Sequence, residues 1–547
     1  MLRNLVSRRT LAPHSSLSRL SSPSRSLATP ATPPSYPELK VTTLPNGIRV
    51  ASDPTPGHFV AAGVYVDAGS RYESLRTRGA GHMVDRLGFK STRNRSSDEM
   101  TKEIEQLGGQ FLSSSSRETI MYQASTYTHS LPNVLSILSD TVLNPLITSE
   151  ELEIQREAAL WEVGEIKNKP EMILPELLHE TAYRDNTLGN PLLCPEDRLE
   201  SMTVDTIKEY LGMWYKPERL VVAAAGVEHE ELVELAERHF GSAKPSTSYS
   251  ATTASSSTIT TSSKSTSTTS SSSHPSRPQS PSSPSQPFST SASSSASQSS
   301  LDPSSFEYLS TAPARYTGGQ LIMENPDLEF THVYVGFEGL SIHDEDIYAL
   351  ATLQVLLGGG GSFSAGGPGK GMYSRLYTSV LNQHYSVDFC SAFHHVYLDS
   401  GLFGLQISVH PQFVSQVGTL IAQQLDSITR PVRGGIDQGD LRRARNQLKS
   451  SLAMALESRM VQVEDLGRQV QVHGRKVSMP EMSHLIDKVT LQDLYRVANR
   501  VLRPHASPVL SDRNKSGKVT VVAQGKVDQL GDIEEALSRR GLAGSSY

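Results

Sequence analysis

The most informative segment of the 547-residue chain is Gly79-Ala80-Gly81-His82-Met83-Val84-Asp85-Arg86-Leu87. Its apolar side chains recur at the i, i+3, i+4, i+7 spacing of a helix with one buried face, which predicts a helix here. Residues four apart on a helix share a face, so His82 and Arg86 are expected to be neighbours. The inverted zinc motif His-x-x-Glu-His has this spacing, with two imidazoles holding the metal and the glutamate acting as general base.

The segment departs from that motif at its last two positions. Asp85 stands where the glutamate is required, and Arg86 stands where the second histidine is required. A guanidinium has no lone pair to donate and stays protonated, so Arg86 cannot bind zinc and its charge repels the ion. We therefore interpret the segment as a metal site that has lost its metal, and we expect no metal ligands and no cofactor in this chain.

A long helix is expected at residues 150–167, where Glu162 stands at the position of a third metal ligand. Gln155 lies seven residues earlier on the same face and is neutral, so a supporting carboxylate is missing as well. The alternative is that Glu157, Glu162 and Glu165 form an ordinary solvated helix face. The sequence leaves both interpretations open.

Glycine dominates a second segment, with eight glycines between Gly358 and Gly371. The phosphate-binding P-loop pattern fails because Ser364 stands at its first glycine and Gly371 at its final hydroxyl position. The dinucleotide pattern fails at Phe363, so nucleotide binding is not expected. Because glycine has the most backbone freedom, the segment is either a flap that contacts an extended peptide or a flexible connector. The aromatic and other apolar side chains interleaved with the glycines favour the flap.

Positive charge is concentrated at the N-terminus. No acidic residue precedes Glu38, whereas five arginines do, among many serines. This composition is typical of a mitochondrial transit peptide, which we place at residues 1–37, with a disordered basic tail as the alternative. Removing residues 1–36 would change the formal net charge from −6 to −11. Such a chain attracts cationic partners and disfavours nucleic acid.

Two protein classes are excluded by composition. Cys194 and Cys390 are too few for a disulfide scaffold and cannot alone build a structural zinc site, which favours a reducing compartment. The longest near-apolar run, 220–227, is far shorter than the ~18–20 residues that cross a bilayer. An integral membrane protein is therefore not expected.

A serine-rich segment divides the chain. Residues 246–300 contain 27 serines among 55 positions and no Asp or Glu, a composition that cannot bury enough apolar surface to fold. We expect a disordered linker at 246–305, an N-terminal domain at 38–245 and a C-terminal domain at 306–547. In both domains a closing apolar strand, at 220–225 and 519–523, is followed by glycine. The mixed strands and helices predict an α+β fold with two homologous domains, each a mostly antiparallel sheet covered by helices on one face.

Taken together, these features resemble one family. The chain resembles the alpha subunits of mitochondrial processing peptidases, which are non-catalytic members of the pitrilysin-type inverted-zincin family. The resemblance extends over about residues 40 to 527, apart from the serine-rich insert. Besides the glycine-rich loop, the segments that carry it are Thr42-Thr43-Leu44-Pro45-Asn46-Gly47, Asp85-Arg86-Leu87-Gly88-Phe89-Lys90-Ser91-Thr92, Leu174-Pro175-Glu176-Leu177-Leu178-His179, Ala444-Arg445-Asn446-Gln447-Leu448-Lys449-Ser450-Ser451, Gly467-Arg468-Gln469 and His473-Gly474-Arg475-Lys476.

The resemblance implies a partner and a substrate. It implies a beta subunit that supplies the zinc and the general base, and two domains that form half of a large polar chamber. It implies binding of the basic presequences of imported precursors in the mitochondrial matrix, free or associated with the inner membrane. Carried over by position, the degenerate catalytic sites are His82, Asp85, Arg86 and Glu162. The implied substrate-binding residues are Gly358, Gly359, Gly360, Gly361, Ser362, Phe363, Gly366, Gly367, Gly369, Lys370 and Gly371.

Two other functions compete with this one. A structural core subunit of the respiratory cytochrome bc1 complex would share the fold and the lost zinc site, but it would not need the glycine-rich loop. An active single-chain metallopeptidase is opposed by Arg86. Acidic residues that line a chamber for basic peptides are not identifiable from the sequence, with Asp344, Glu345 and Asp346 as the candidates nearest the loop.

Overall fold

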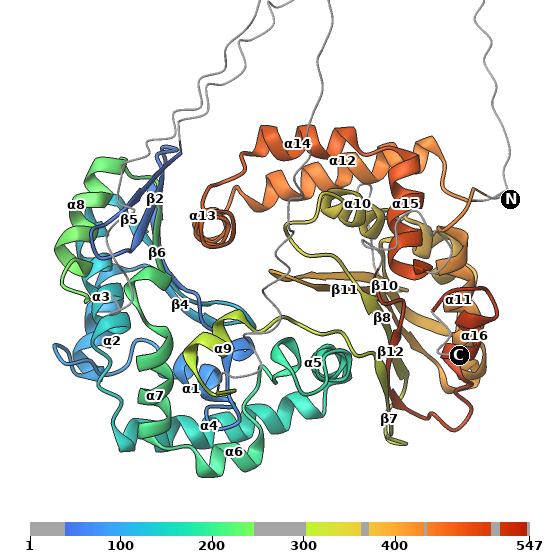
Figure 1. The fold of residues 1–547 in the computed structure, drawn as a ribbon, viewed down its shortest axis with the longest axis horizontal. Coiled ribbons are helices and arrows are strands. Elements are labelled where there is room, and N and C mark those ends of the chain that lie inside the picture. Colours follow the sequence, from blue (N-terminus) through green and yellow to red (C-terminus); the bar gives the residue numbers. More distant parts are fainter. Residues whose placement is uncertain (1–38, 245–301, 363–370, 432–434, 505–514, 544–547) are drawn as a thin grey trace, which may run out of the picture. The chain divides into compact units, whose positions relative to one another are not determined.

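Each half of the chain builds a six-stranded sheet around fully buried apolar strands (Figure 1). The computed structural model describes residues 39–244, 302–362, 371–431, 435–504 and 515–543. They belong to one compact unit, Glu38–Tyr547. The expected transit peptide at 1–37 lies outside the described residues, as does nearly all of the expected linker, of which only the last few residues from 302 onward are described.

The first sheet has the strand order β1-β2-β6-β3-β5-β4. Its strands are β1 Lys40–Thr43, β2 Arg49–Asp53, β3 Phe59–Val66, β4 Gln110–Ser115, β5 Ile120–Tyr127 and β6 Leu220–Ala225. The helices of this half are α1 Ala80–Arg86, α2 Ser97–Leu107, α3 Leu131–Leu143, α4 Ser149–Lys167, α5 Pro170–Ala182, α6 Glu196–Ser201, α7 Val204–Trp214 and α8 His229–Phe240.

The second sheet has the order β7-β12-β8-β11-β10-β9. Its strands are β7 Gly319–Glu324, β8 Thr331–Glu338, β9 Gly359–Gly361, β10 Val387–Val396, β11 Gly401–Val409 and β12 Val519–Gly525. The helices are α9 Phe306–Thr311, α10 Ile347–Leu357, α11 Val417–Ser427, α12 Gln438–Ala455, α13 Arg459–His473, α14 Met479–Lys488, α15 Leu491–Leu502 and α16 Ile533–Ser538.

The two sheets share one topology. In each, a single parallel pair, β2 with β6 and β7 with β12, interrupts otherwise antiparallel pairing. The closing strands also end alike, because Gly226 directly after β6 and Gly525 at the end of β12 both adopt positive φ, 91° and 137°. A positive φ suits glycine, which has no Cβ to clash with the backbone. The predicted α+β fold of two homologous, mostly antiparallel domains is confirmed.

Helices of the same half cover one face of each sheet, where the larger apolar cores lie. β6 is buried along its whole length, which explains the longest apolar run of the sequence as the central strand of a sheet. Among the described residues, no helix combines the length and the apolar character needed to cross a bilayer.

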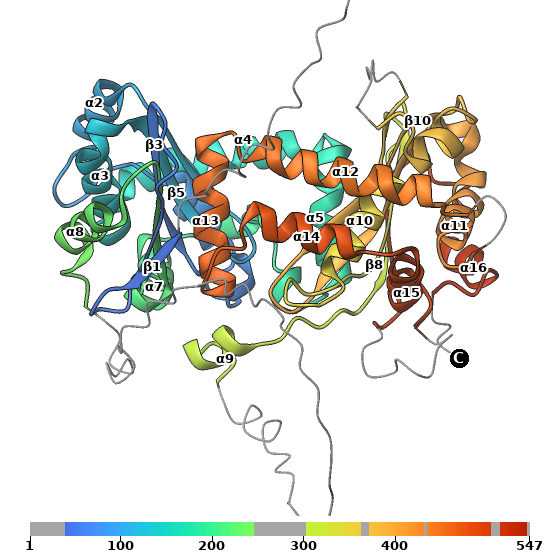
Figure 2. The same ribbon diagram turned by 90° about the horizontal axis from the view of Figure 1, so that it is seen from above.

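The second face of each sheet carries a helix from the other half, which the sequence did not reveal. Helix α13 packs on β3 and β6 of the first sheet, and α5 packs on β8 and β12 of the second (Figures 1 and 2). On α13, Val463, Leu466 and Val470 are fully buried against the first sheet. Burying one such side chain stabilises a fold by ~1.5–3 kcal/mol, so this exchange of helices joins the halves strongly.

Gly467 on α13 makes a close helix-to-sheet contact. A Cβ at this position would lie 2.1 Å from Cε2 of Tyr65, whose ring is fully buried on β3. The Tyr65 hydroxyl accepts a hydrogen bond from Gln123 Nε2 at 2.8 Å, which holds the ring in place. Glycine is therefore required at 467 for α13 to reach the sheet.

Polar contacts also join the halves. Arg71 is buried and forms ion pairs with Glu118 of its own half at 2.6 Å and with Asp399 of the other half at 2.5 Å. Helix α9 follows the serine-rich insert but packs on the first core, with the ring of Phe306 centred 5.3 Å from that of Trp214. The chain therefore returns to the first half before it enters the second sheet.

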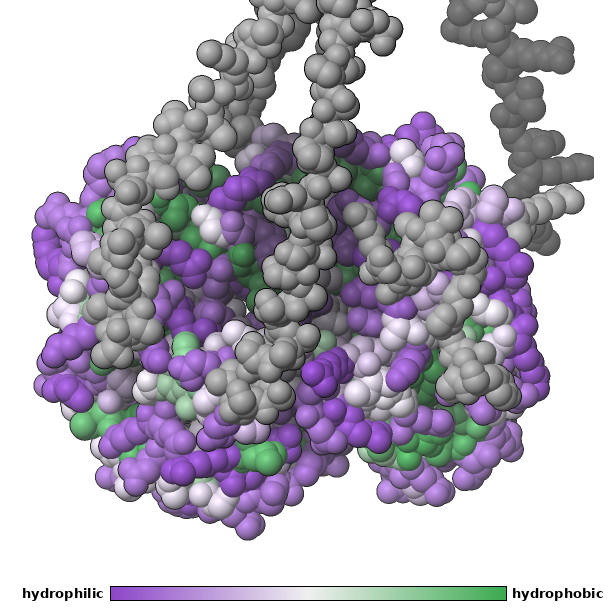
Figure 3. Space-filling model, viewed as in Figure 1, coloured by the Kyte–Doolittle hydropathy of each residue, from purple (hydrophilic) through white to green (hydrophobic). Residues whose placement is uncertain are grey.

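The face shown in Figure 3 is mostly hydrophilic, with hydrophobic residues in separate areas. Large apolar side chains with high exposure are spread over several elements of the described chain, including Leu75 at 81%, Trp161 at 72% and Tyr385 at 97%. Isolated exposed apolar residues are ordinary on protein surfaces and by themselves indicate no binding site.

Candidate functional site: a degenerate metal centre

Helices α1 and α4 bring the three positions of the lost zinc motif together. The segment at 79–87 forms helix α1 as predicted, beginning after Gly79, which has φ 82°. Glu73 caps its start, because its two carboxylate oxygens accept the backbone N–H groups of Gly79 and Gly81, both at 2.7 Å. Burial raises the pKa of Glu73 to about 8. This buried carboxyl group anchors the helix that carries His82 and Arg86.

Arg86 and Glu162 form a direct ion pair between α1 and α4. His82 is buried beside it, with Nε2 3.6 Å from the same Glu162 oxygen, Oε2. Contact with His82 and the charge of Arg86 together lower the pKa of the Glu162 carboxyl group. Glu162 therefore belongs to this cluster, whereas Glu157 and Glu165 are exposed, as expected of a solvated face.

The His82 ring is held from its other side. Its Nδ1 accepts a hydrogen bond from the backbone N–H of Cys194 at 3.2 Å. A neutral imidazole has one acceptor nitrogen and one N–H, so this bond assigns the proton to Nε2, the nitrogen nearest Glu162. The sequence could not indicate this contact, because the partner is a backbone group more than a hundred residues away.

Asp85, at the position of the general base, is engaged by strand β4. One of its carboxylate oxygens accepts a hydrogen bond from Ser113 Oγ at 2.7 Å, and the other accepts the backbone N–H of Ser115 at 2.9 Å. With both oxygens bound, the carboxylate fastens α1 to the first sheet.

The residues present do not fit zinc. A zinc ligand must offer a lone pair, and at the second ligand position Arg86 offers a guanidinium that has none. Its Nε is buried without a hydrogen-bond partner, so the side chain is held by the ion pair at its tip. Within the described ranges, no group of three or more His, Cys, Asp or Glu residues is arranged to hold a metal ion.

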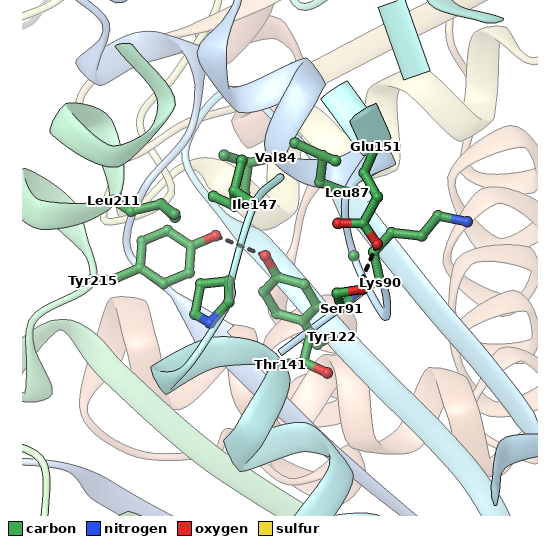
Figure 4. Close-up of a pocket in the computed structure, with 12 residues that line it drawn as sticks. Val84, Leu87, Lys90, Ser91, Tyr122, Thr141, Ile147, Glu151, Leu211 and Tyr215 are labelled. Atoms are coloured by element: carbon green, nitrogen blue, oxygen red, sulfur yellow. Dashed lines mark hydrogen bonds between the residues drawn. The ribbon is translucent and has the colours of Figure 1, made fainter. Parts of the chain in front are cut away.

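The opposite side of α1 faces a small, largely apolar pocket of about 20 Å³ (Figure 4). Val84 of α1 and Leu87, the residue after α1, line it together with Tyr122 and Tyr215, whose hydroxyl groups are 2.9 Å apart. A space this small holds about one water molecule. The pocket is therefore a packing feature and offers no room for a substrate.

The glycine-rich segment begins as the edge strand of the second sheet. Gly359, Gly360 and Gly361 form β9, which pairs with β10. A Cβ on Gly359 would lie 2.0 Å from the carbonyl oxygen of Cys390, whereas one on Gly360 would meet nothing within 4 Å. Of the expected substrate-binding residues, the structure describes Gly358, Gly359, Gly360, Gly361, Ser362 and Gly371, while Phe363, Gly366, Gly367, Gly369 and Lys370 lie outside the described residues.

The acidic residues nearest the loop have structural partners. Asp344 binds Arg500 at 2.6 Å, and Asp346 binds Arg496 at 2.5 Å. Hydrogen bonds and charge from Arg500 lower the pKa of Asp344 despite its partial burial. These two carboxylates tie the start of α10 to α15, so they are poor candidates for binding a basic peptide.

A cavity of about 400 Å³, which the sequence did not reveal, lies between α13 and residues of both halves. Four carboxylates line it, and each has a cationic partner. The pairs are Asp67 with Arg219, Glu118 with Arg71, Glu464 with Arg468 and Asp465 with Lys476. Arg71 also pairs with Asp399, and Lys476 also pairs with Asp53, so each of these two cations is shared by two carboxylates and the negative charge is not fully balanced.

Comparison with known proteins assigns the family. Residues 49–196 match the model of the insulinase family, peptidase family M16, and residues 201–448 match the M16 inactive domain. The chain is 51% identical to the mitochondrial-processing peptidase subunit alpha of Neurospora crassa over 500 residues, 88% of this chain and 86% of the relative. The human subunit alpha is 35% identical over 91% of this chain and 84% of its own length.

A Schizosaccharomyces pombe protein described as a probable subunit alpha is 38% identical over 93% of this chain and 90% of its own length. The degenerate zinc position, with its Arg86–Glu162 ion pair, lies within the part of the chain that matches the insulinase family model. The chain therefore belongs to peptidase family M16, in the group formed by the alpha subunits of mitochondrial-processing peptidases.

Proposed function

We propose that this chain is the substrate-recognising, non-catalytic subunit of a mitochondrial processing peptidase. In this role it binds the basic presequences of imported precursors, and a zinc-bearing beta subunit cleaves them in the mitochondrial matrix. The observation that carries the non-catalytic part is the Arg86–Glu162 ion pair at the metal position. The names of the relatives support a role as a peptidase subunit.

The domain plan belongs to the same proposal. It consists of a transit peptide at 1–37, an N-terminal domain at 38–245, a serine-rich linker at 246–305 and a C-terminal domain at 306–547. The family matches and the shared topology of the two sheets support two homologous domains.

For presequence binding we propose the glycine-rich loop, Gly358–Gly371. Two features support it. First, β9 is an edge strand, and an edge strand can pair through its backbone with an extended peptide. Second, a chain with formal charge −6, or −11 after loss of residues 1–36, attracts arginine-rich peptides at long range.

The direct test is binding of a fluorescent presequence peptide to the chain without residues 1–37, comparing wild type with a variant that lacks Gly358–Gly371. Loss of binding in the deletion variant supports the proposal. Equal binding in both, or binding by neither, contradicts it and favours a structural role such as that of a bc1 core subunit.

Two alanine substitutions test β9 more finely. Gly359→Ala places a Cβ 2.0 Å from a backbone oxygen at a position with φ 103°, so β9 should detach from β10. Gly361→Ala has ordinary φ and its nearest neighbour is 4.0 Å away, so it serves as the matched control. We expect Gly359→Ala to weaken peptide binding about tenfold relative to wild type, a loss of ~1.4 kcal/mol, and Gly361→Ala to leave it within about twofold. Equal effects of the two substitutions would show that strand β9 does not position the loop.

A further inference from the structure

The lost zinc site retains the ligand spacing of a metal centre. His82 Nε2 and Glu162 Oε2 are 3.6 Å apart. With Zn–N of about 2.0–2.1 Å and Zn–O of about 2.0–2.2 Å, two tetrahedral ligands lie about 3.4 Å apart. The third position, residue 86, follows His82 by four residues on α1, as the inverted motif requires. Distance alone therefore does not prevent zinc binding here.

We propose that the site excludes zinc by two separate locks, the guanidinium of Arg86 and the backbone N–H of Cys194, so that Arg86→His alone does not restore a zinc centre. The two locks act on different ligands and can be removed one at a time.

The first lock is electrostatic. Arg86 places a permanent positive charge against Glu162, the acidic ligand, and so takes the position of the metal cation. Arg86 pairs with the Glu162 carboxylate and so links α1 to α4, as a metal ion bound by both helices would. A second cation at this point would meet the repulsion of the first.

The second lock is the protonation pattern of His82. A metal-binding histidine donates its second ring N–H to an acceptor, commonly a carbonyl or a carboxylate, which leaves the lone pair of the first nitrogen for the metal. Here the second nitrogen, Nδ1, receives an N–H from Cys194 at 3.2 Å. The proton therefore sits on Nε2, where the metal would bind. If the proton moved to Nδ1, the Nδ1–H and the Cys194 N–H would point at each other inside a buried site.

The first experiment measures metal binding by Arg86→His in the full chain. Zn²⁺ is followed by titration calorimetry and Co²⁺ by the absorption of tetrahedral cobalt. Arg442→His, at an exposed position on α12, is the matched control for an added histidine. We expect Arg86→His to bind Zn²⁺ no more than about threefold better than this control and to show no tetrahedral cobalt spectrum. Stoichiometric tetrahedral binding by Arg86→His would overturn the proposal, because one lock would then suffice.

The second experiment removes the backbone donor by Cys194→Pro in the Arg86→His background. Residue 194 already precedes Pro195, a context that disfavours helical backbone. Because unsuitable outer partners typically cost 10–100-fold in metal affinity, we expect the double variant to bind Zn²⁺ at least tenfold more tightly than Arg86→His. A folded double variant with unchanged affinity would refute the second lock. Thermal melting identifies a variant that does not fold, in which case the Arg86→His result alone decides.

Discussion

The contact between Gly467 and Tyr65 leads to the most discriminating prediction. In Gly467→Ala the new Cβ would lie 2.1 Å from a fully buried ring whose hydroxyl group is fixed by Gln123. Because an ordinary carbon contact is about 3.5–4.0 Å, helix α13 must move away from the sheet by more than about 1 Å. Overpacking of this kind costs ~1–3 kcal/mol, and partial exposure of the apolar residues of α13 adds to it.

Helix propensity alone predicts the opposite sign. Replacing a mid-helix glycine by alanine should stabilise the protein by ~1 kcal/mol. Overpacking less the gain in helix propensity leaves a net loss of up to ~2 kcal/mol for Gly467→Ala, to which the exposed apolar residues of α13 add. We expect this loss as a lower calorimetric transition temperature and faster hydrogen exchange in α13. Gly164→Ala on α4 is the matched control, because a Cβ there meets nothing within 4 Å, and it should be neutral or stabilising.

The reasoning can be refuted in two ways. If Gly467→Ala and Gly164→Ala have the same stability, then α13 does not pack on β3 as closely as described above. If Tyr65→Leu fails to offset part of the Gly467→Ala loss in the double variant, the ring is not the obstacle, since residues in contact should be non-additive.

Three further predictions concern buried charge and thiols. Burial and nearby Arg117 lower the pKa of His395 to about 4, partly offset by Glu176, and lower that of its neighbour His179 well below 6.5. The unfolded chain then binds more protons between about pH 4 and 6.5, so stability should fall by ~3 kcal/mol for His395 alone as the pH drops through that window. A pH series of melting temperatures tests this, and His395→Gln should flatten it only in part, because burial also lowers the pKa values of His179 and His394. Arg71→Met leaves Glu118 and Asp399 without their shared cation and should cost ~3 kcal/mol in denaturant unfolding, whereas an effect below ~1 kcal/mol would mean the pairs are solvent-screened. Cys194 and Cys390 are buried with pKa values raised by burial to about 12, so both should react with a thiol reagent only after denaturation, and a fast-reacting native thiol would contradict their burial.

Much of the fold could be predicted from local sequence. Strand β6 coincides with the expected 220–225, and β12 begins at residue 519 as expected and continues to Gly525, because continuous apolar runs identify buried strands. Helices α1 and α4 were predictable from apolar spacing and length. Strand β9 was not, since three glycines have no strand preference and acquire their conformation from pairing with β10.

Some features of the degenerate metal site could likewise be predicted from the sequence, and others could not. The loss of a metal ligand at Arg86 was visible in the sequence, because it follows from residue type and i, i+4 spacing. The pairing of Arg86 with Glu162 was not, because a solvated helix face fits the same pattern on α4. The Cys194 bond to His82 could not be predicted at all, since a backbone N–H carries no residue-specific signal.

The exchange of α5 and α13 has a consequence for the order in which the protein can fold. A chain that emerges N-terminus first completes the first sheet long before residues 459–473 exist to cover its second face. Until then Ala51, Tyr65 and Val221 present a water-exposed apolar surface, on which an incomplete chain can aggregate. The second face of the first sheet can therefore be covered only after residues 459–473 have been synthesised.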